Sequence, residues 1–459
     1  MTSSRESALL FARNHYTEAL TLLKEIVAVP SISTDPDHKS DMWRAADWFA
    51  NQLNKIGFEA AVYESRGHPI AFGSFKSSSP NAKTILVYGH MDVQPVDPVE
   101  LWKSDPFLPE LRGEELYGRG ASDMKGQVVA SLKAVEAVLA QGDPGINIKF
   151  MIEGEEEIGS PNLAEFMRAH KDLLACDLIL NPDSGMLSKS TPAITYALRG
   201  ISAFEIRLYG PDHDLHSGGY GGVVHNPAQV LCDLLAGMHD QDGKVTLPGF
   251  YDKVRPLQGD EREKLSRLPI TEEIILKETG APALWHGERG FTPVERTGAR
   301  PTLEINGMTS GFTGQGSKTI IPAYAMGKIS CRLVPDQNPE DVLEMVKLYL
   351  TQNAPNTVRW EIHWQHGGAA YMADLDQPGT KALVDALQTV WSVEPVYIRV
   401  GGSIPIVASM KEILGADSII TGFGLPDDHI HAPNEKLDLP TWYNGIDTLI
   451  HFFYNYQTL

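Results

Sequence analysis

The chain has 459 residues, enough for two or three domains, and its hydrophobic content of 42% can supply a sizeable core. It carries 39 Lys and Arg against 59 Asp and Glu, for a formal net charge of −20. Such an acidic surface repels nucleic-acid phosphates and anionic lipid headgroups, so we expect neither as a partner. A local basic pocket could still accept an acidic substrate.

The cysteines and the N-terminal sequence predict a cytoplasmic protein. Cys176, Cys232 and Cys331 are odd in number and form no CxxC motif, so we expect no disulfide framework. The first residues lack a continuous apolar segment before a small-residue cleavage site. No run of about 18 apolar residues occurs anywhere, so no membrane span is expected.

The first 200 residues alternate helix-like and strand-like patterns. Helices are expected at 5–27, 41–57, 125–142 and near 161–174, and strands at 85–89, 148–154 and 177–182. Short buried strands that alternate with helices predict an α/β domain with a mostly parallel sheet flanked by helices. Ligands of such sheets bind at the carboxyl ends of the strands.

The pattern changes near Gly200. The segments 201–211, 327–335 and 357–364 alternate apolar and polar residues, as half-exposed antiparallel strands do, and helices are expected at 226–239 and 339–353. A polar, helix-prone stretch occupies 252–300, and the α/β pattern resumes with 380–393, 418–423 and 441–456. We therefore expect one discontinuous α/β domain, 1–198 and 375–459, interrupted by an α+β domain at 199–374.

Acidic and histidine residues follow the predicted strands. They occur in TILVYGHMDV (His90, Asp92), LYGRGASDMKG (Asp123), IKFMIEGEEEIGS (Glu156, Glu157), CDLILNPDSG (Asp183) and GFGLPDDHIHAPNE (His431). Two histidines and several carboxylates are ligands suited to two divalent metal ions. A two-metal site activates water for attack on a carbonyl and stabilises the resulting oxyanion. The sequence therefore predicts a hydrolase.

Taken singly, most of these residues have a simpler interpretation. The His-x-Asp of His90 is typical of a strand-end turn, Asp123 of a helix N-cap, Asp183 of a turn and His431 of a surface position. The three consecutive glutamates at 155–157 are harder to explain as a solvated run, because close like charges repel unless cations compensate. Their joint occurrence at successive strand ends favours the metal site.

The blocks GHMDVQP, LYGRGASDMKG, EGEEEIGS and HAPNE also carry a family resemblance. From Val27 to His431 the chain resembles the co-catalytic di-zinc metallopeptidases, a family that includes cytosolic non-specific dipeptidase, carnosinase, glutamate carboxypeptidase, acetylornithine deacetylase and succinyl-diaminopimelate desuccinylase. The resemblance implies a zinc-peptidase-like catalytic domain with an inserted lid domain. It also implies two divalent ions per subunit, expected to be zinc, with manganese or cobalt as alternatives.

The same resemblance implies a ligand set. His90 and Asp183 would bind one metal ion, Glu157 and His431 would bind the other, and Asp123 would bridge the two.

Roles around the metals follow from the resemblance as well. Asp92 would orient His90, and Glu156 would be the general base for a hydroxide that bridges the metals, passing the proton to the leaving nitrogen. The family's cis peptide after the bridging aspartate would be Asp123–Met124. Glu155 stands where relatives often have an apolar residue, and it adds a negative charge beside the base.

The inserted domain resembles the family's lid, which commonly also forms a homodimer. GPDHDLHSGGYGG is close to the dipeptidase branch, and its His216 would reach the partner subunit's site and polarise the scissile carbonyl. Thr319, Arg332, Gly402 and Ser403 would bind the substrate's backbone and terminal carboxylate, for which a guanidinium fork is well suited. Without the resemblance, His216 would be a turn residue and Arg332 a solvated strand residue.

The blocks WKSDPFLPELRGEELYGRG and ARPTLEINGM and the long lid segment look most like the dipeptidase and carnosinase branch. We therefore expect a metal-dependent dipeptidase that cleaves dipeptides with a free C-terminal carboxylate. One alternative is an N-acyl (acetyl, succinyl or carbamoyl) amino acid amidohydrolase of the same family. A non-catalytic binding protein on this scaffold is a more remote alternative, since it predicts a lost ligand or base and none is missing.

Overall fold

The computed structural model describes residues 4–285, 287–402 and 404–459. The chain divides into two compact units. The first comprises Met1–Tyr196, Ala373–Ile398 and Ser409–Leu459, and the second comprises Ala197–Met372 and Arg399–Ala408. None of the helices in the described ranges is long and apolar enough to cross a membrane.

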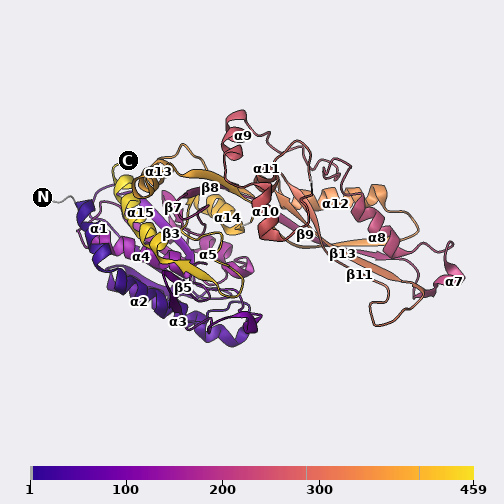
Figure 1. Cartoon of the computed structure of the whole chain (residues 1–459), viewed down its shortest axis with the longest axis horizontal. Coiled ribbons are helices and arrows are strands. Elements are labelled where there is room, and N and C mark those ends of the chain that lie inside the picture. The colour runs from indigo at the N-terminus through magenta and orange to yellow at the C-terminus, as the bar shows by residue number, and fades with distance from the viewer. Residues whose placement is uncertain (1–3, 286, 403) are drawn as a thin grey trace. The chain divides into compact units, whose positions relative to one another are not determined.

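The first unit is built on a mixed sheet with the order β1-β2-β6-β3-β7-β17-β8. Figure 1 labels three of these strands, β3, β7 and β8. The strands are β1 (Glu59–Tyr63), β2 (Ile70–Phe75), β3 (Thr84–His90), β6 (Asn147–Glu153), β7 (Leu178–Asn181), β8 (Ala193–Leu198) and β17 (Asp417–Ile420). The centre, β6-β3-β7-β17, is parallel, and β1, β2 and β8 pair antiparallel at its sides. The predicted α/β class with a mostly parallel sheet is confirmed. Two further strands pair with β8: β15 (Tyr371–Met372), whose residues belong to the second unit, and β16 (Val396–Val400), which ends in it.

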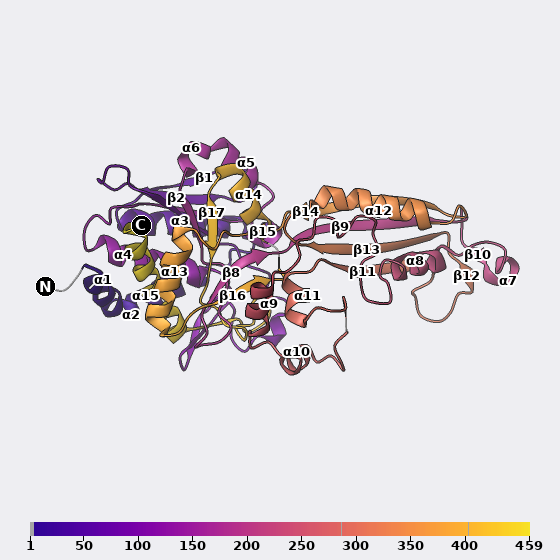
Figure 2. The same cartoon turned by 90° about the horizontal axis from the view of Figure 1, so that it is seen from above.

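Helices pack on both faces of this sheet. Figure 2 shows α1, α2, α13 and α15 gathered on one side and α5 and α6 on the other. The helices are α1 (Ser4–Asn14), α2 (Tyr16–Val27), α3 (Lys39–Lys55), α4 (Lys125–Leu139), α5 (Leu163–Ala169), α6 (Lys171–Leu174), α13 (Pro378–Trp391), α14 (Pro405–Leu414) and α15 (Leu439–Gln457). The single helix predicted at 5–27 is two helices that meet at His15, whose Nδ1 lies 2.7 Å from the Phe11 carbonyl oxygen.

The helix after the LYGRGASDMKG block is the most deeply placed. Nearly every residue of α4 is buried, because α1, α2 and α15 pack around it. Trp442 of α15 is fully buried and donates a hydrogen bond from Nε1 to the Gly126 carbonyl oxygen at 2.7 Å. The C-terminal helix therefore fixes the start of α4, and with it the loop that carries Asp123.

A small sheet joins two of the sequence blocks that lie far apart in the chain. Its strands are β4 (Glu110–Arg112), β5 (Glu115–Tyr117) and β18 (Lys436–Asp438), in the order β18-β5-β4. The backbone amide of Gly118 also donates to the Glu435 carbonyl oxygen at 3.0 Å. The HAPNE block thus runs beside the LYGRG block.

The second unit has its own antiparallel sheet, in the order β11-β13-β9-β14. Its strands are β9 (Gly200–Tyr209), β11 (Thr302–Ser310), β13 (Tyr324–Leu333) and β14 (Arg359–Gly368). Helices α8 (Pro227–Ala236) and α12 (Pro339–Asn353) pack on this sheet around a separate hydrophobic core. The helix-prone stretch forms α9 (Gly259–Ser266), α10 (Glu272–Thr279) and α11 (Pro293–Gly298).

Three of these sheet strands match the predicted ones, and β11 was not predicted. Its register shifts between Ile305 and Gly307, so the strict alternation that identifies a half-exposed strand is interrupted.

Candidate metal centre

Four of the predicted residues lie at the carboxyl ends of three parallel strands, at one edge of the sheet. His90 is the last residue of β3, the Glu155–Glu157 run follows β6, and Asp183 follows β7. Since β6, β3 and β7 are neighbours in register, their carboxyl ends meet at that edge. The fold therefore brings together residues that are separated by tens of positions in the sequence.

His90 is completely buried and held at both ring nitrogens. Its Nδ1 lies 2.9 Å from the backbone oxygen of Asp92 and 3.5 Å from the Asp92 carboxylate. Its Nε2 lies 3.2 Å from Oδ1 of Asp123. Burial alone would lower the pKa of His90, but the contacts with Asp123 and Asp92 outweigh it and raise the pKa.

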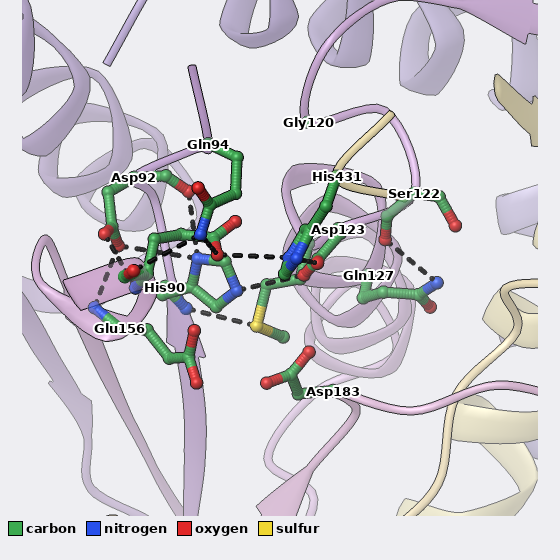
Figure 3. Close-up of polar contacts among 12 residues, drawn as sticks. His90, Asp92, Gln94, Gly120, Ser122, Asp123, Gln127, Glu156, Asp183 and His431 are labelled. Carbon is green, nitrogen blue, oxygen red and sulfur yellow. Dashed lines mark hydrogen bonds and ion pairs between the residues drawn. The ribbon is translucent and has the colours of Figure 1, made fainter. Parts of the chain in front are cut away.

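Asp123 lies between the two predicted histidine ligands (Figure 3). Its Oδ2 is 2.9 Å from His431 Nε2, and its Oδ1 faces His90. Burial would raise its pKa, yet the contacts with His431 and His90 hold it below the usual range. Met124, rather than Asp123, is the N-cap residue of α4, so the alternative of a capping aspartate does not hold. The expected cis peptide Asp123–Met124 is present.

His431 closes the cluster from the C-terminal part of the chain. Its Nε2 lies 3.1 Å from Glu157 Oε2, and the same oxygen accepts a hydrogen bond from Gln94 Nε2 at 2.8 Å. The ring is half exposed, yet its backbone has the left-handed φ of +61°, which a non-glycine residue adopts at an energetic cost. The contacts of Nε2 show that His431 is not a free surface histidine.

The three consecutive glutamates point in different directions. Glu157 faces His431, and Glu156 lies beside the cluster (Figure 3). Glu155 is buried and turned away, because its carboxylate accepts hydrogen bonds from the His68 amide at 3.2 Å and from Asn162 Nδ2 at 3.0 Å. The Glu155 carboxylate is thus stabilised by hydrogen bonds from two neutral donors outside the cluster.

The run is held in this arrangement by Asp92. The fully buried Asp92 carboxylate accepts the backbone amides of Glu156 at 3.2 Å and Glu157 at 3.0 Å. One aspartate therefore fixes both the ring of His90, through its backbone oxygen, and the short 3₁₀ turn Glu156–Ile158.

The carboxylates of Glu156 and Asp183 are not matched by protein donors. Among the described residues, no side-chain or backbone donor reaches either carboxylate. Burial raises the pKa of Glu156, and the charges of Asp183 and Glu157 raise it further against the opposing effect of His90. Burial likewise raises the pKa of Asp183 to about 7. Divalent cations would relieve this repulsion, so the donor set fits them.

Among the described residues, one cluster has metal-binding geometry. The ligand atoms of His90, Asp123 and Glu157 all lie within 4.8 Å of one another. His431 contacts two of these residues, and Figure 3 shows Asp183 beside them. Nitrogen and carboxylate oxygen atoms at this spacing are those that zinc, manganese and cobalt accept.

The other predicted residues lie in the second unit. His216 ends β10 (Leu215–His216), which pairs with β12 (Ile320–Ile321), and its Nδ1 accepts a hydrogen bond from the Gly218 amide at 3.0 Å. The Thr319 carbonyl oxygen accepts the Ser217 amide at 3.0 Å, so Thr319 lies next to His216 across the β10–β12 pair.

Arg332 lies on β13 and lines a cavity of about 370 Å³ together with Arg199, Trp285 and Arg300. Burial lowers the pKa of Arg332 below the ordinary arginine value. Gly402 lies in the second unit, and Ser403 falls outside the described residues.

Two residues of the centre were missed by the sequence analysis. Gln94 lies in the GHMDVQP block and binds Glu157, and Glu435 lies in the HAPNE block and binds the loop of Asp123. Both are within the blocks that carry the resemblance, which was the available signal. Their side chains were not assigned because nothing local reveals which distant group each one contacts.

The chain matches the model of the peptidase family M20/M25/M40 over residues 86–455. It is 33% identical over 457 residues to the Cys-Gly metallodipeptidase of Candida albicans, covering 95% of this chain and 93% of that protein. It is 34% identical over 469 residues to the Beta-Ala-His dipeptidase of Homo sapiens, covering 96% and 90%. Among solved structures, an M20 family metallo-carboxypeptidase from Sulfolobus solfataricus superposes with a TM-score of 0.86 at 31% identity, covering 96% and 100%.

Replacement of Glu157 by Gln should weaken metal binding far more than the same change at Glu155. Glu157 contributes an oxygen to the cluster, whereas Glu155 is bound to His68 and Asn162. For Glu157→Gln we expect a loss of affinity beyond the roughly 10–100-fold that loss of an outer-shell partner costs. Calorimetric titration of metal-stripped protein with Zn²⁺ or Mn²⁺ measures it. Equal affinities in the two variants would show that Glu157 is not a ligand.

Proposed function

Because the chain belongs to the peptidase family M20/M25/M40, with metallodipeptidases among its relatives, we propose that it is a metal-dependent dipeptidase. Its substrates would be dipeptides with a free C-terminal carboxylate. The observation that carries the proposal is the cluster of His90, Asp123 and Glu157, closed by His431.

The proposed ligand sets are His90 with Asp183 and Glu157 with His431, with Asp123 shared by both. Two bound divalent ions, zinc before manganese or cobalt, would lower the pKa of a water shared between them and polarise the scissile carbonyl. The placement of Asp123 between the two histidines supports its shared role.

Glu156 is the proposed general base. Its carboxylate lies beside the cluster, accepts no hydrogen bond from the described residues, and has a raised pKa because of burial and the neighbouring carboxylates. A base with these properties can accept a proton from the attacking water at its carboxylate and deliver it to the leaving nitrogen. Asp92 keeps Glu156 in place through the backbone and holds His90 in a fixed orientation.

Substrate recognition is proposed for the second unit, which would act as a lid. Arg332 would bind the terminal carboxylate, and Thr319, Gly402 and Ser403 would bind the peptide backbone. His216 would polarise the scissile carbonyl in the partner subunit of a homodimer. In support of a dimer, β11 is an edge strand whose Ile305 and Met308 side chains are about half exposed, which suits pairing with another chain.

We also propose a cytoplasmic location for this protein. It rests on the three cysteines, which form no disulfide.

The Glu156→Gln variant should keep its metal and lose turnover. The amide cannot take a proton, while the ligand set is unchanged, so we expect kcat to fall by about 10²–10⁴-fold. Glu155→Gln is the matched control, since it removes one negative charge from the same run outside the cluster. Metal content and steady-state kinetics measured on both variants decide the matter. Near-wild-type turnover in Glu156→Gln would remove Glu156 from the role.

A substrate panel tests the proposed function. Metal-stripped protein would be refilled with Zn²⁺ or Mn²⁺ and given cysteinyl-glycine, β-alanyl-histidine, a tripeptide, and N-acetyl, N-succinyl and N-carbamoyl amino acids. We expect metal-dependent cleavage of the dipeptides only. Mass spectrometry of the products measures it. Cleavage of one acyl class alone would establish the amidohydrolase alternative. Sequential removal of C-terminal residues from longer peptides would make the enzyme a carboxypeptidase, as the relative from Sulfolobus solfataricus is named.

Subunit complementation tests the role of His216 in the partner's site. His216→Ala and Glu156→Gln should each be inactive alone. If His216 acts across the dimer, mixed dimers contain one intact composite site, and mixing should restore some activity. Native mass spectrometry would confirm that mixed dimers form. Mixed dimers without activity would place His216 in its own subunit's site or outside any site.

A further inference from the structure

Glu435 carries a buried carboxylate. Among the described residues, every donor that binds this carboxylate lies in the loop of Asp123. Its Oε1 accepts the backbone amides of Ser122 and Asp123, each at 3.0 Å. Its Oε2 accepts the Gly120 amide at 3.0 Å and Nη1 of Arg119 at 2.8 Å. Each oxygen therefore has two donors, and all four come from the segment 119–123.

Glu435 also lies four residues after His431 in the chain. Its carboxylate therefore links the segment of His431 to the loop of Asp123. The intervening chain has little freedom, because Asn434 adopts a left-handed φ of +65° and its side chain binds the backbone of Leu101 and Lys103 at 2.8 Å each. After Glu435 the chain enters β18, which is fixed by its pairing with β5. The position of Glu435 is thus determined from both sides.

Asp123 has no comparable support on its own side chain. Its two oxygens face His90 and His431, so its direction depends on the backbone that Glu435 holds. Asp428 reinforces the loop by accepting the Ser122 hydroxyl at 2.7 Å, but Glu435 is the group that binds the Asp123 amide.

We propose that Glu435 is a positioning residue that sets the Asp123 carboxylate between His90 and His431 and thereby permits one aspartate to serve two metal ions. The inference rests on the proposed function, because it concerns the same metal pair. Glu435 itself would touch neither the metals nor the substrate.

A purely structural role is the competing explanation. Arg119 and Glu435 are each 1% exposed, and removal of one partner of a buried ion pair destabilises a protein by leaving the other charge unpaired. Glu435→Gln should therefore lower the melting temperature whichever explanation holds. The double variant Arg119→Met/Glu435→Gln removes both charges and should regain the part of that stability that the unpaired charge costs. It leaves the amides of Gly120, Ser122 and Asp123 without their full set of acceptors.

The experiment compares wild type, the single variant, the double variant and Asp447→Asn. Asp447 is the matched control, because it is a buried carboxylate of the same unit that binds Arg13 and Tyr16 away from the cluster. Each protein would be stripped and titrated with Mn²⁺, and the exchange-coupled signal of a metal pair would be followed by electron paramagnetic resonance. Melting temperature, kcat and KM would be measured on the same preparations.

We expect the double variant to melt above Glu435→Gln and still fail to form the coupled pair. The affinity for the more weakly bound Mn²⁺ ion of the pair should fall by roughly 10–100-fold, as it does when other groups that orient metal ligands are removed. In turn kcat should fall at least about tenfold with KM within about threefold, because the groups that bind the peptide are untouched. Asp447→Asn should keep the coupled signal despite any loss in melting temperature.

A double variant that regains the coupled pair along with its stability would overturn the inference, since the ion pair alone would then explain Glu435. So would a folded Glu435→Gln variant with the wild-type titration. Wild-type protein that binds the Mn²⁺ pair but cleaves no dipeptide would overturn the proposed substrate. The inference on Glu435 would then be decided by the Mn²⁺ titrations of the variants alone.

Discussion

Repulsion among carboxylates is the constraint on which the metal centre depends. The fold places Asp92, Asp123, Glu156, Glu157 and Asp183 at the ends of adjacent parallel strands or in the loop beside them. Charges this close interact by several kcal/mol at the effective dielectric near a protein surface. Burial raises the pKa of Glu156 and of Asp183, and the neighbouring carboxylates raise both further. An edge of this kind is stable only if protons, backbone amides or cations offset the charge.

The structure separates these carboxylates by how completely protein donors bind them. Asp92 accepts two backbone amides, and Glu435 accepts three amides and a guanidinium, so both are bound by the protein itself. Glu156 and Asp183 accept none from the described residues and have capacity for a cation or a proton. The number of protein donors thus separates Asp92 and Glu435 from the proposed base Glu156 and the proposed ligand Asp183.

His90, Glu157 and Asp183 could be proposed as ligands from the sequence because they end or directly follow buried apolar strands, which the period-two and helical patterns identify from local sequence alone. Local sequence does not separate Glu155 from Glu157, because their directions depend on His68, Asn162 and His431. Glu435 was missed for the same reason, since its donors lie more than 300 residues earlier in the chain. The prediction of one helix at 5–27 missed the break at His15. Strand β11 was not predicted because its bulge at Gly307 interrupts the alternation of apolar and polar residues.

Chemistry and recognition are assigned to different units of this chain. Every proposed metal ligand and the proposed base belong to the first unit, whereas His216, Thr319, Arg332 and Gly402 belong to the second. On the proposed assignment, substitutions in the second unit would alter which peptide is accepted and leave the charges at the sheet edge unchanged. Relatives at about the same identity are named for Cys-Gly and for Beta-Ala-His. On the proposed assignment, the residues that distinguish such dipeptides would be those of the second unit.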